Sequence, residues 1–377
     1  MKIDAACLMK ISRIDVTSLS YPLECEAYDA TARWREYNWI LVRVETSNGL
    51  VGFADIAPLH GREMEIFEAI IKKKLEPLVV GESPYDVERL WAKTLGRGSS
   101  AYALGTKGAV VTAISAIDIA LWDIISQSFD TPLYNVLGGK FREKVMIYGS
   151  FMGRVPLEII KELKRQGFKA IKFKVGFDVK RDVEETRKLR EVLDDFKIMV
   201  DANQGYDLSK AIAFSEKVKE FDIEWIEEPI NVFNMRDLAI LAAKCDIPIA
   251  LGENYYSLQE FSEVITKGIA GVIQPDINHG GGITQIRKIA SIAECYDVKF
   301  APHIHSIIGF MVGLHLLTST PNGYLAEYPM YGAQWTLRDK FIEKCVEIEN
   351  GYAYLKCRRG IGVEYYEDLI EKYKVHQ

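Results

Sequence analysis

The feature of the sequence that most restricts its fold is a series of short β-rich runs that alternate with amphipathic segments after Gly138-Gly139. The runs recur about every 25 residues, the length of one strand–helix unit. The predicted strands are residues 145–151, 170–175, 197–202, 223–228, 247–253, 271–276, 298–304 and 323–328. Such units predict an α/β fold with parallel strands. Eight of them favour a closed (β/α)8-type barrel over the alternative, an open doubly wound sheet.

The segment before the barrel has a different pattern. Residues 39–55 alternate apolar and polar side chains around Asn48-Gly49, a strong hairpin signal. Helical spacing of apolar residues follows over residues 63–78, 84–95 and 107–126. This part of the chain therefore predicts a small α+β domain.

The length of 377 residues accommodates a barrel of roughly 250 residues and a second domain. We predict an N-terminal α+β capping domain over residues 1–140 and a barrel catalytic domain over residues 141–328. Residues 329–377 have no further strand–helix unit and are expected to pack back on the capping domain.

Composition excludes several classes of protein. The chain has 47 Lys and Arg against 53 Asp and Glu, so it lacks the basic excess of a nucleic-acid-binding protein. No apolar run reaches the roughly 18 residues of a membrane span, and the first twenty residues lack a signal-peptide core. The six cysteines form no C-x-x-C pair. We expect a cytoplasmic protein without a nucleic-acid or membrane partner.

Acidic residues end three neighbouring predicted strands: Asp201, Glu227 and Glu253. A single acid after a strand is more often a helix cap or a solvated loop residue. In a barrel, however, the C-terminal ends of the strands meet at one mouth, so these three carboxylates would repel one another unless a cation lies between them. Ligation by oxygen alone favours Mg²⁺ over zinc.

A pair of lysines, Lys172 and Lys174, lies on one side of the second predicted strand. Such a pair is usually a solvated face, but the interior of a barrel is packed. Two ammonium groups about 7 Å apart repel by about 2.4 kcal/mol at an effective dielectric constant of about 20. This repulsion would lower the pKa of a lysine by about 1.7 units, which makes Lys174 a candidate base.

The later strands end in further titratable residues. His303 taken alone is more often a core or surface histidine, but Asp276 on the adjacent strand could fix its tautomer and raise its basicity. Glu327 ends the eighth strand, where a structural and a functional role are equally plausible.

Together these motifs resemble the enolase superfamily, and within it the mandelate racemase subgroup. The likeness covers nearly the whole chain and includes the stretches ALWD, LGGK, KFK, DAN, WIEEP, GEN and QPD-x-x-x-GG and the histidine of the seventh strand. The resemblance implies a modified (β/α)7β barrel under a capping domain. It also implies one Mg²⁺ held by Asp201, Glu227 and Glu253.

The resemblance implies roles for the remaining residues as well. Lys174 would be one base, with Lys172 tuning it and touching the substrate. His303 paired with Asp276 would be the second acid/base. Glu327 would hydrogen-bond a carboxylate oxygen of the substrate, and Asn203 would contact the substrate.

The activity implied by the resemblance is Mg²⁺-dependent removal of the α-proton of a hydroxy carboxylate. Dehydration of an acid sugar to a 2-keto-3-deoxy acid ranks first, and a racemase or epimerase of an α-hydroxy acid second. A cycloisomerase is disfavoured because that branch has a lysine where this chain has Asp276. The family also implies a homo-oligomer that acts on a small carboxylate.

The capping domain is expected to set specificity through residues 24–35 and 60–62. Arg33 and Arg35 could meet a second carboxylate of a diacid, although solvated arginines are the simpler reading.

The sequence also contains partial signals for three other classes of protein. His303-x-His305 is compatible with a histidine-metal amidohydrolase, which would need several more histidine ligands. His279-Gly-Gly-Gly282 imitates an esterase oxyanion loop, but the sequence has no G-x-S-x-G. The last rival is a non-catalytic binding protein on the same fold.

Overall fold

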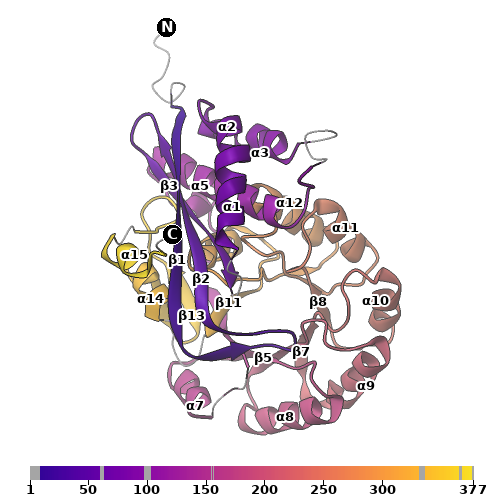
Figure 1. The fold of residues 1–377 in the computed structure, drawn as a ribbon. Coiled ribbons are helices and arrows are strands. Elements are labelled where there is room, and N and C mark those ends of the chain that lie inside the picture. The colour runs from indigo at the N-terminus through magenta and orange to yellow at the C-terminus, as the bar shows by residue number, and fades with distance from the viewer. Residues whose placement is uncertain are drawn as a thin grey trace.

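The computed structural model describes residues 9–59, 63–96, 103–153, 155, 157–330, 336–364 and 367–375. The N-terminal region begins with an antiparallel sheet in the order β1-β2-β3, with strands β1 (Ile11–Tyr28), β2 (Arg33–Thr46) and β3 (Val51–Leu59) (Figure 1). The helices that follow are α1 (Met64–Ile70), η2 (Ile71–Leu75), α2 (Glu76–Val79), η3 (Pro84–Asp86), α3 (Val87–Leu95), α5 (Ala109–Ser128) and α6 (Leu133–Val136). The predicted hairpin and helical regions are confirmed, whereas β1 was not predicted.

Helix α5 packs directly on β3. A Cβ atom at Gly52 would lie 2.0 Å from the carbonyl oxygen of Ala120, so only glycine permits this approach. With 20 residues and a mean hydropathy of 1.8, α5 is long and apolar enough to cross a membrane. The expectation that no apolar run reaches the length of a membrane span is therefore wrong. Of that apolar stretch, 94% is buried inside the structure, as is typical of a core helix.

The barrel is built from eight parallel strands within the described part of the chain. They are β4 (Val145–Phe151), β5 (Ala170–Lys174), β6 (Lys197–Asp201), β7 (Ile223–Glu227), β8 (Ile249–Leu251), β9 (Val272–Ile273), β10 (Lys299–Phe300) and β11 (Leu325–Met330). Neighbours pair in chain order, β11 pairs with β4, and a parallel bridge between Phe300 and Gly323 closes the ring.

Seven connections carry the barrel helices, which gives the (β/α)7β arrangement and confirms the predicted fold class. The helices are α7 (Leu157–Arg165), α8 (Val179–Val192), α9 (Leu208–Val218) with η4 (Lys219–Phe221), α10 (Met235–Ala242), α11 (Leu258–Thr266), α12 (Gly282–Glu294) and α13 (Ile307–Ser319). In Figure 1, α8 to α11 follow one another around the outside of the strands. Short polar side chains start several of them; Asp178, Asn234 and Ser257, for example, each accept a hydrogen bond from a first-turn amide.

An apolar cluster inside the barrel supports the site. It contains one buried residue from each of seven strands and Ala301, directly after β10: Tyr148, Ala170, Met199, Trp225, Ala250, Val272, Ala301 and Leu325. Side chains alternate along a strand, so the next inward position lies two residues closer to the C-terminal end. In seven of the eight cases that next residue is polar: Ser150, Lys172, Asp201, Glu227, Gln274, His303 and Glu327. Inside the barrel, a layer of polar side chains therefore lies next to the apolar cluster, on the side of the C-terminal strand ends.

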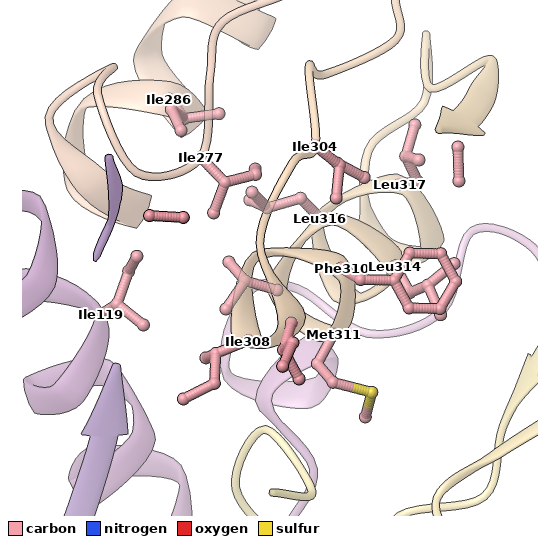
Figure 2. Close-up of a cluster of buried hydrophobic side chains, with 14 of the residues drawn as sticks. Ile119, Ile277, Ile286, Ile304, Ile308, Phe310, Met311, Leu314, Leu316 and Leu317 are labelled. Atoms are coloured by element: carbon pink, nitrogen blue, oxygen red, sulfur yellow. The ribbon is translucent and has the colours of Figure 1, made fainter. Parts of the chain in front are cut away.

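The capping domain is joined to the barrel by an apolar core and by buried acids. Figure 2 shows Ile119 of α5, Ile286 of α12, and Ile308 and Met311 of α13 in one cluster of buried hydrophobic side chains. Asp55 on β3 accepts hydrogen bonds from Ser306 Oγ at 2.9 Å and from the Ile308 amide at 2.9 Å, at the start of α13. These contacts hold the cap against the C-terminal face of the barrel.

The C-terminal segment contains α14 (Thr336–Ile342), β12 (Val346–Glu349), β13 (Tyr352–Leu355) and α15 (Glu367–Tyr373). α15 lies against β1, next to a bridge between Leu19 and Lys374. The β12–β13 hairpin was not predicted, and it pairs antiparallel with β4 of the barrel. The segment thus touches both regions, and the three-part division at residues 140 and 328 stays a prediction.

Candidate active site

Three carboxylates meet at the barrel mouth. Asp201 ends β6, Glu227 ends β7 and Glu253 follows β8, and their oxygen atoms lie within 4.8 Å of one another. Asp201 and Glu227 are fully buried, while the Glu253 side chain keeps 15% of its exposure. Burial and the neighbouring Asp201 carboxylate raise the pKa of Glu227 to about 7. The sequence prediction that these acids converge is therefore matched by the geometry.

Two buried lysines neutralise part of this charge. Lys174 Nζ lies 2.6 Å from Asp201 Oδ2, and Lys172 Nζ lies 2.7 Å from Glu227 Oε1. Burial would lower the pKa of Lys174, but the Asp201 carboxylate outweighs it, so the pKa is raised above its ordinary value. The predicted lowering is wrong for this state because it counted the repulsion from Lys172 and not the contact with Asp201. With its pKa raised, Lys174 carries its proton in this state, and it must lose that proton before it can act as a base.

His303 has a carboxylate partner at each of its ring nitrogens. Its Nδ1 lies 2.6 Å from Asp276 Oδ2, and its Nε2 lies 3.1 Å from Glu253 Oε2 at the mouth. Burial would lower the pKa of His303, but Glu253 and Glu327 raise it to about 10. Burial alone would raise the pKa of Asp276, yet the charges of nearby histidines hold it well below its usual range. The predicted His303–Asp276 pair is thus present.

Glu327 and Asn203 complete the set of predicted residues. Glu327 accepts hydrogen bonds from Ser150 Oγ at 2.6 Å and from the Ile304 amide at 3.0 Å, and it contacts Lys172 at 2.9 Å. Burial opposes ionisation, but Lys172 and His303 lower the pKa of Glu327 to about 2. Glu327 would therefore have to gain a proton before it could donate to a substrate carboxylate.

Asn203 bridges the two ends of the acid row, which consists of Asp201, Glu227 and Glu253. Its Oδ1 accepts a hydrogen bond from Lys174 at 2.7 Å, and its Nδ2 donates to Glu253 at 3.1 Å. Its φ of 40° is left-handed, a conformation that asparagine tolerates better than most residues. Asn203 also lines the cavity that contains Glu253 and His303, in keeping with its predicted contact with substrate.

The geometry fits a hard divalent cation. Asp201, Glu227 and Glu253 offer oxygen atoms only, and their mutual repulsion is what raises the pKa of Glu227 after burial. A cation between them would replace the charge that Lys172 and Lys174 now supply. Mg²⁺ accepts a few carboxylates together with water and substrate oxygens.

Two sequence profiles of known families match the chain. The profile described as "Enolase C-terminal domain-like" matches residues 157–369, and that of the "Mandelate racemase / muconate lactonizing enzyme, N-terminal domain" matches residues 18–138. The first alone spans more than half of the sequence. The chain belongs to the enolase superfamily. Within it, the N-terminal match places the chain with the mandelate racemase/muconate lactonizing enzymes.

Named relatives in the superfamily have more than one activity. Arabinonate dehydratase of Saccharolobus solfataricus is 31% identical over 89% of this chain and 90% of its own length. D-galactarolactone cycloisomerase of Agrobacterium fabrum is 28% identical over 97% of this chain and 99% of its own. The crystal structure of a racemase from Streptomyces coelicolor with bound magnesium has a TM-score of 0.86 and 26% identity, and the match covers 97% of this chain and 100% of that one. The likeness to a cycloisomerase weakens the sequence argument against that branch.

One residue of this enolase-superfamily site was underrated in the sequence. His305 was considered only as a cue for an amidohydrolase, but its Nδ1 lies 2.8 Å from Asp276 Oδ2 and its Nε2 lies 3.0 Å from the Ala57 carbonyl oxygen. Both neighbours accept hydrogen bonds, so His305 ties Asp276 to the capping domain. The signal in the sequence was the position of His305, two residues after His303 and after the same strand.

The specificity predictions have mixed outcomes. Residues 60–62 lie outside the described residues, as do the side chains of residues 24 and 25. Arg33 and Arg35 are exposed and each contacts Glu26 at 3.4 Å. Neither lines the cavity at the barrel mouth, so the simpler reading of solvated arginines holds.

Proposed function

We propose that the chain is a Mg²⁺-dependent enzyme that removes the proton next to the carboxylate of a sugar acid and eliminates water, giving a 2-keto-3-deoxy acid. The observation that carries the proposal is the position of two potential bases at opposite ends of one acid row. Lys174 contacts Asp201 at one end, and His303 contacts Glu253 at the other.

Asp201, Glu227 and Glu253 would hold the metal. When bound, Mg²⁺ would supply positive charge for the carboxylate oxygens of the substrate as the α-proton leaves. Lys172 lies beside Glu227 and Glu327 and would add a fixed positive charge for the same oxygens.

Lys174 and His303 would share the proton transfers. One of them takes the α-proton, and the electron pair of the broken C–H bond becomes part of the new double bond. The other protonates the β-hydroxyl, which leaves as water, and the resulting enol becomes the keto acid. Asp276 would orient His303 through the 2.6 Å contact to Nδ1 and leave Nε2 facing the substrate.

Racemisation or epimerisation of an α-hydroxy acid is the second candidate. The same two groups at opposite ends of the acid row could take a proton from one face and return one to the other. The likeness to a racemase structure with bound magnesium favours this candidate, whereas the greater identity to arabinonate dehydratase favours dehydration.

We expect incubation with Mg²⁺ and a panel of sugar acids to produce a 2-keto acid from at least one of them, and we expect a chelator to abolish the reaction. A colorimetric 2-keto-acid assay, run in parallel with proton NMR in D₂O, measures this. If the α-proton of a panel member exchanges with solvent while no keto acid forms, the racemase replaces the dehydratase. If neither change occurs with any member, both candidates fail.

A small carboxylate substrate, a homo-oligomer and a cytoplasmic location remain predictions of this proposal. Size-exclusion chromatography with light scattering measures the oligomeric state directly.

A further inference from the structure

The capping domain and the barrel mouth line one cavity of about 590 Å³. Its barrel side includes Glu253 and His303, and its cap side includes Asp29, Thr31 and Glu63. Such a volume lies within the roughly 300 to 1,000 Å³ that small-molecule sites occupy. A sugar acid whose carboxylate lies at the acid row would therefore extend its far end toward the cap.

The cap reaches this position through the β1–β2 connection. The Tyr28 ring lies 6.4 Å from the Phe177 ring, which follows β5, so the end of the hairpin sits against the barrel (Figure 1). Asp29 and Thr31 follow directly after Tyr28 in this connection. Their side chains are thus placed at the mouth by packing.

The far end of the cavity is acidic. Among the described lining residues, the acids are Asp29, Glu63, Glu228 and Glu253, and none is lysine or arginine. Glu253 belongs to the proposed metal site, and Glu228 accepts hydrogen bonds from the Asn254 and Gln204 side-chain amides. Asp29 and Glu63 remain as acids at the cap side.

One carboxylate oxygen of Asp29 accepts hydrogen bonds from residues of its own turn. Its Oδ1 accepts hydrogen bonds from the Thr31 amide at 2.6 Å, the Thr31 hydroxyl at 2.7 Å and the Ala32 amide at 2.8 Å. No described residue donates a hydrogen bond to Oδ2. The turn therefore fixes a carboxylate whose second oxygen can accept a hydrogen bond from a ligand.

We propose that this cavity selects sugar acids with one carboxylate over those with two, and that Asp29 or Glu63 accepts the one hydrogen bond that the terminal hydroxyl can donate. The inference rests on the proposed function. A terminal CH₂OH group donates a hydrogen bond, whereas a second carboxylate can only accept and would meet like charge. Specificity of this kind comes from repulsion of the wrong ligand as well as from attraction of the right one.

Matched acid pairs test this directly, because galactonate differs from galactarate, and gluconate from glucarate, only at C6. Dissociation constants are measured by calorimetry with the Mg²⁺-loaded protein, and kcat/KM is measured for each acid. The monoacid of at least one pair is expected to bind about 50-fold more tightly, as for two like charges about 7 Å apart at an effective dielectric constant of about 20.

Two variants locate the selectivity. Asp29→Asn keeps the Oδ1 acceptor for Thr31 and Ala32 and removes the charge. Glu63→Gln removes the charge of Glu63, directly before α1. Each is expected to reduce the preference for the monoacid at least about fivefold, mainly by strengthening diacid binding. Glu26→Gln is the control, because Glu26 lies on β1, three residues before Asp29, but contacts Arg33 and Arg35.

The outcomes separate the inference from the function on which it rests. Equal or tighter binding of the diacids, with turnover, would overturn the inference and leave the proposed function standing. A monoacid preference that both variants leave unchanged would overturn the role of Asp29 and Glu63. If no acid of any pair binds or reacts, both proposals fail.

Discussion

A Glu227→Gln variant is expected to bind Mg²⁺ at least about 100-fold more weakly and to lose at least about 10³-fold in kcat. Glu227 occupies the middle strand of the acid row, so it is the one carboxylate with an acid neighbour on each side. The amide keeps the shape of the side chain but removes the charge that would hold the cation. Calorimetric titration with Mg²⁺ and the 2-keto-acid assay measure the two effects.

The control for this variant is Glu224→Gln on the same strand. Glu224 lies at the opposite end of β7 and contacts Lys197 at 2.7 Å and Lys299 at 2.9 Å instead of the acid row. It should bind Mg²⁺ as the unmodified protein does. Unchanged Mg²⁺ affinity in Glu227→Gln would remove the metal site from this account.

Lys174→Met and His303→Asn are each expected to lose about 10² to 10⁴-fold in kcat while still binding Mg²⁺. Each variant removes one of the two groups that flank the acid row, and dehydration needs both a base and an acid. Steady-state kinetics with the best substrate of the panel, together with Mg²⁺ titration, separates lost chemistry from a lost metal.

Lys169→Met is the matched control for the lysine variant. Lys169 directly precedes β5, is exposed and pairs with Asp195 at 2.5 Å, so its loss should leave kcat within about twofold, as for a surface ion pair. Should either Lys174→Met or His303→Asn retain more than about a tenth of the activity, that residue would not be an acid/base of this enzyme.

The barrel and its site were largely predictable because two periodicities coincide in the sequence. Strand–helix units place the strand ends together, and a polar residue ends β5, β6 and β7 and follows β8 within two residues. Asp201, Glu227 and Glu253 therefore converge as their positions alone suggested. Metal ligation and catalysis by the individual residues stay predictions until the variants above are measured.

Some of what was missed had a local signal. Asn350-Gly351 separates β12 from β13, and both residues have positive φ, 52° and 74°, as a two-residue hairpin turn requires. The Asn48-Gly49 pair was recognised as such a signal, and the later pair was not. Strand β1, by contrast, contains Pro22 and has a register shift between Pro22 and Ala27, so its pattern of alternation is broken.

Other features depend on contacts that the sequence does not contain. The raised pKa of Lys174 follows from burial opposed by Asp201, a partner on the neighbouring strand. The role of Asp55 depends on its contact with Ser306 at the start of α13, about 250 residues further along the chain. Long-range pairings of this kind become visible only once the cap and the barrel are placed against each other.

The central claim is that the hydrogen next to the substrate carboxylate is removed as a proton, which then reaches water. The most direct test uses the best panel substrate deuterated at C2, with the products analysed by mass spectrometry and NMR. The account predicts that deuterium is released to water, that release requires Mg²⁺ and that Lys174→Met or His303→Asn slows it. Deuterium retained in the product, for example transferred to C3, would contradict the account.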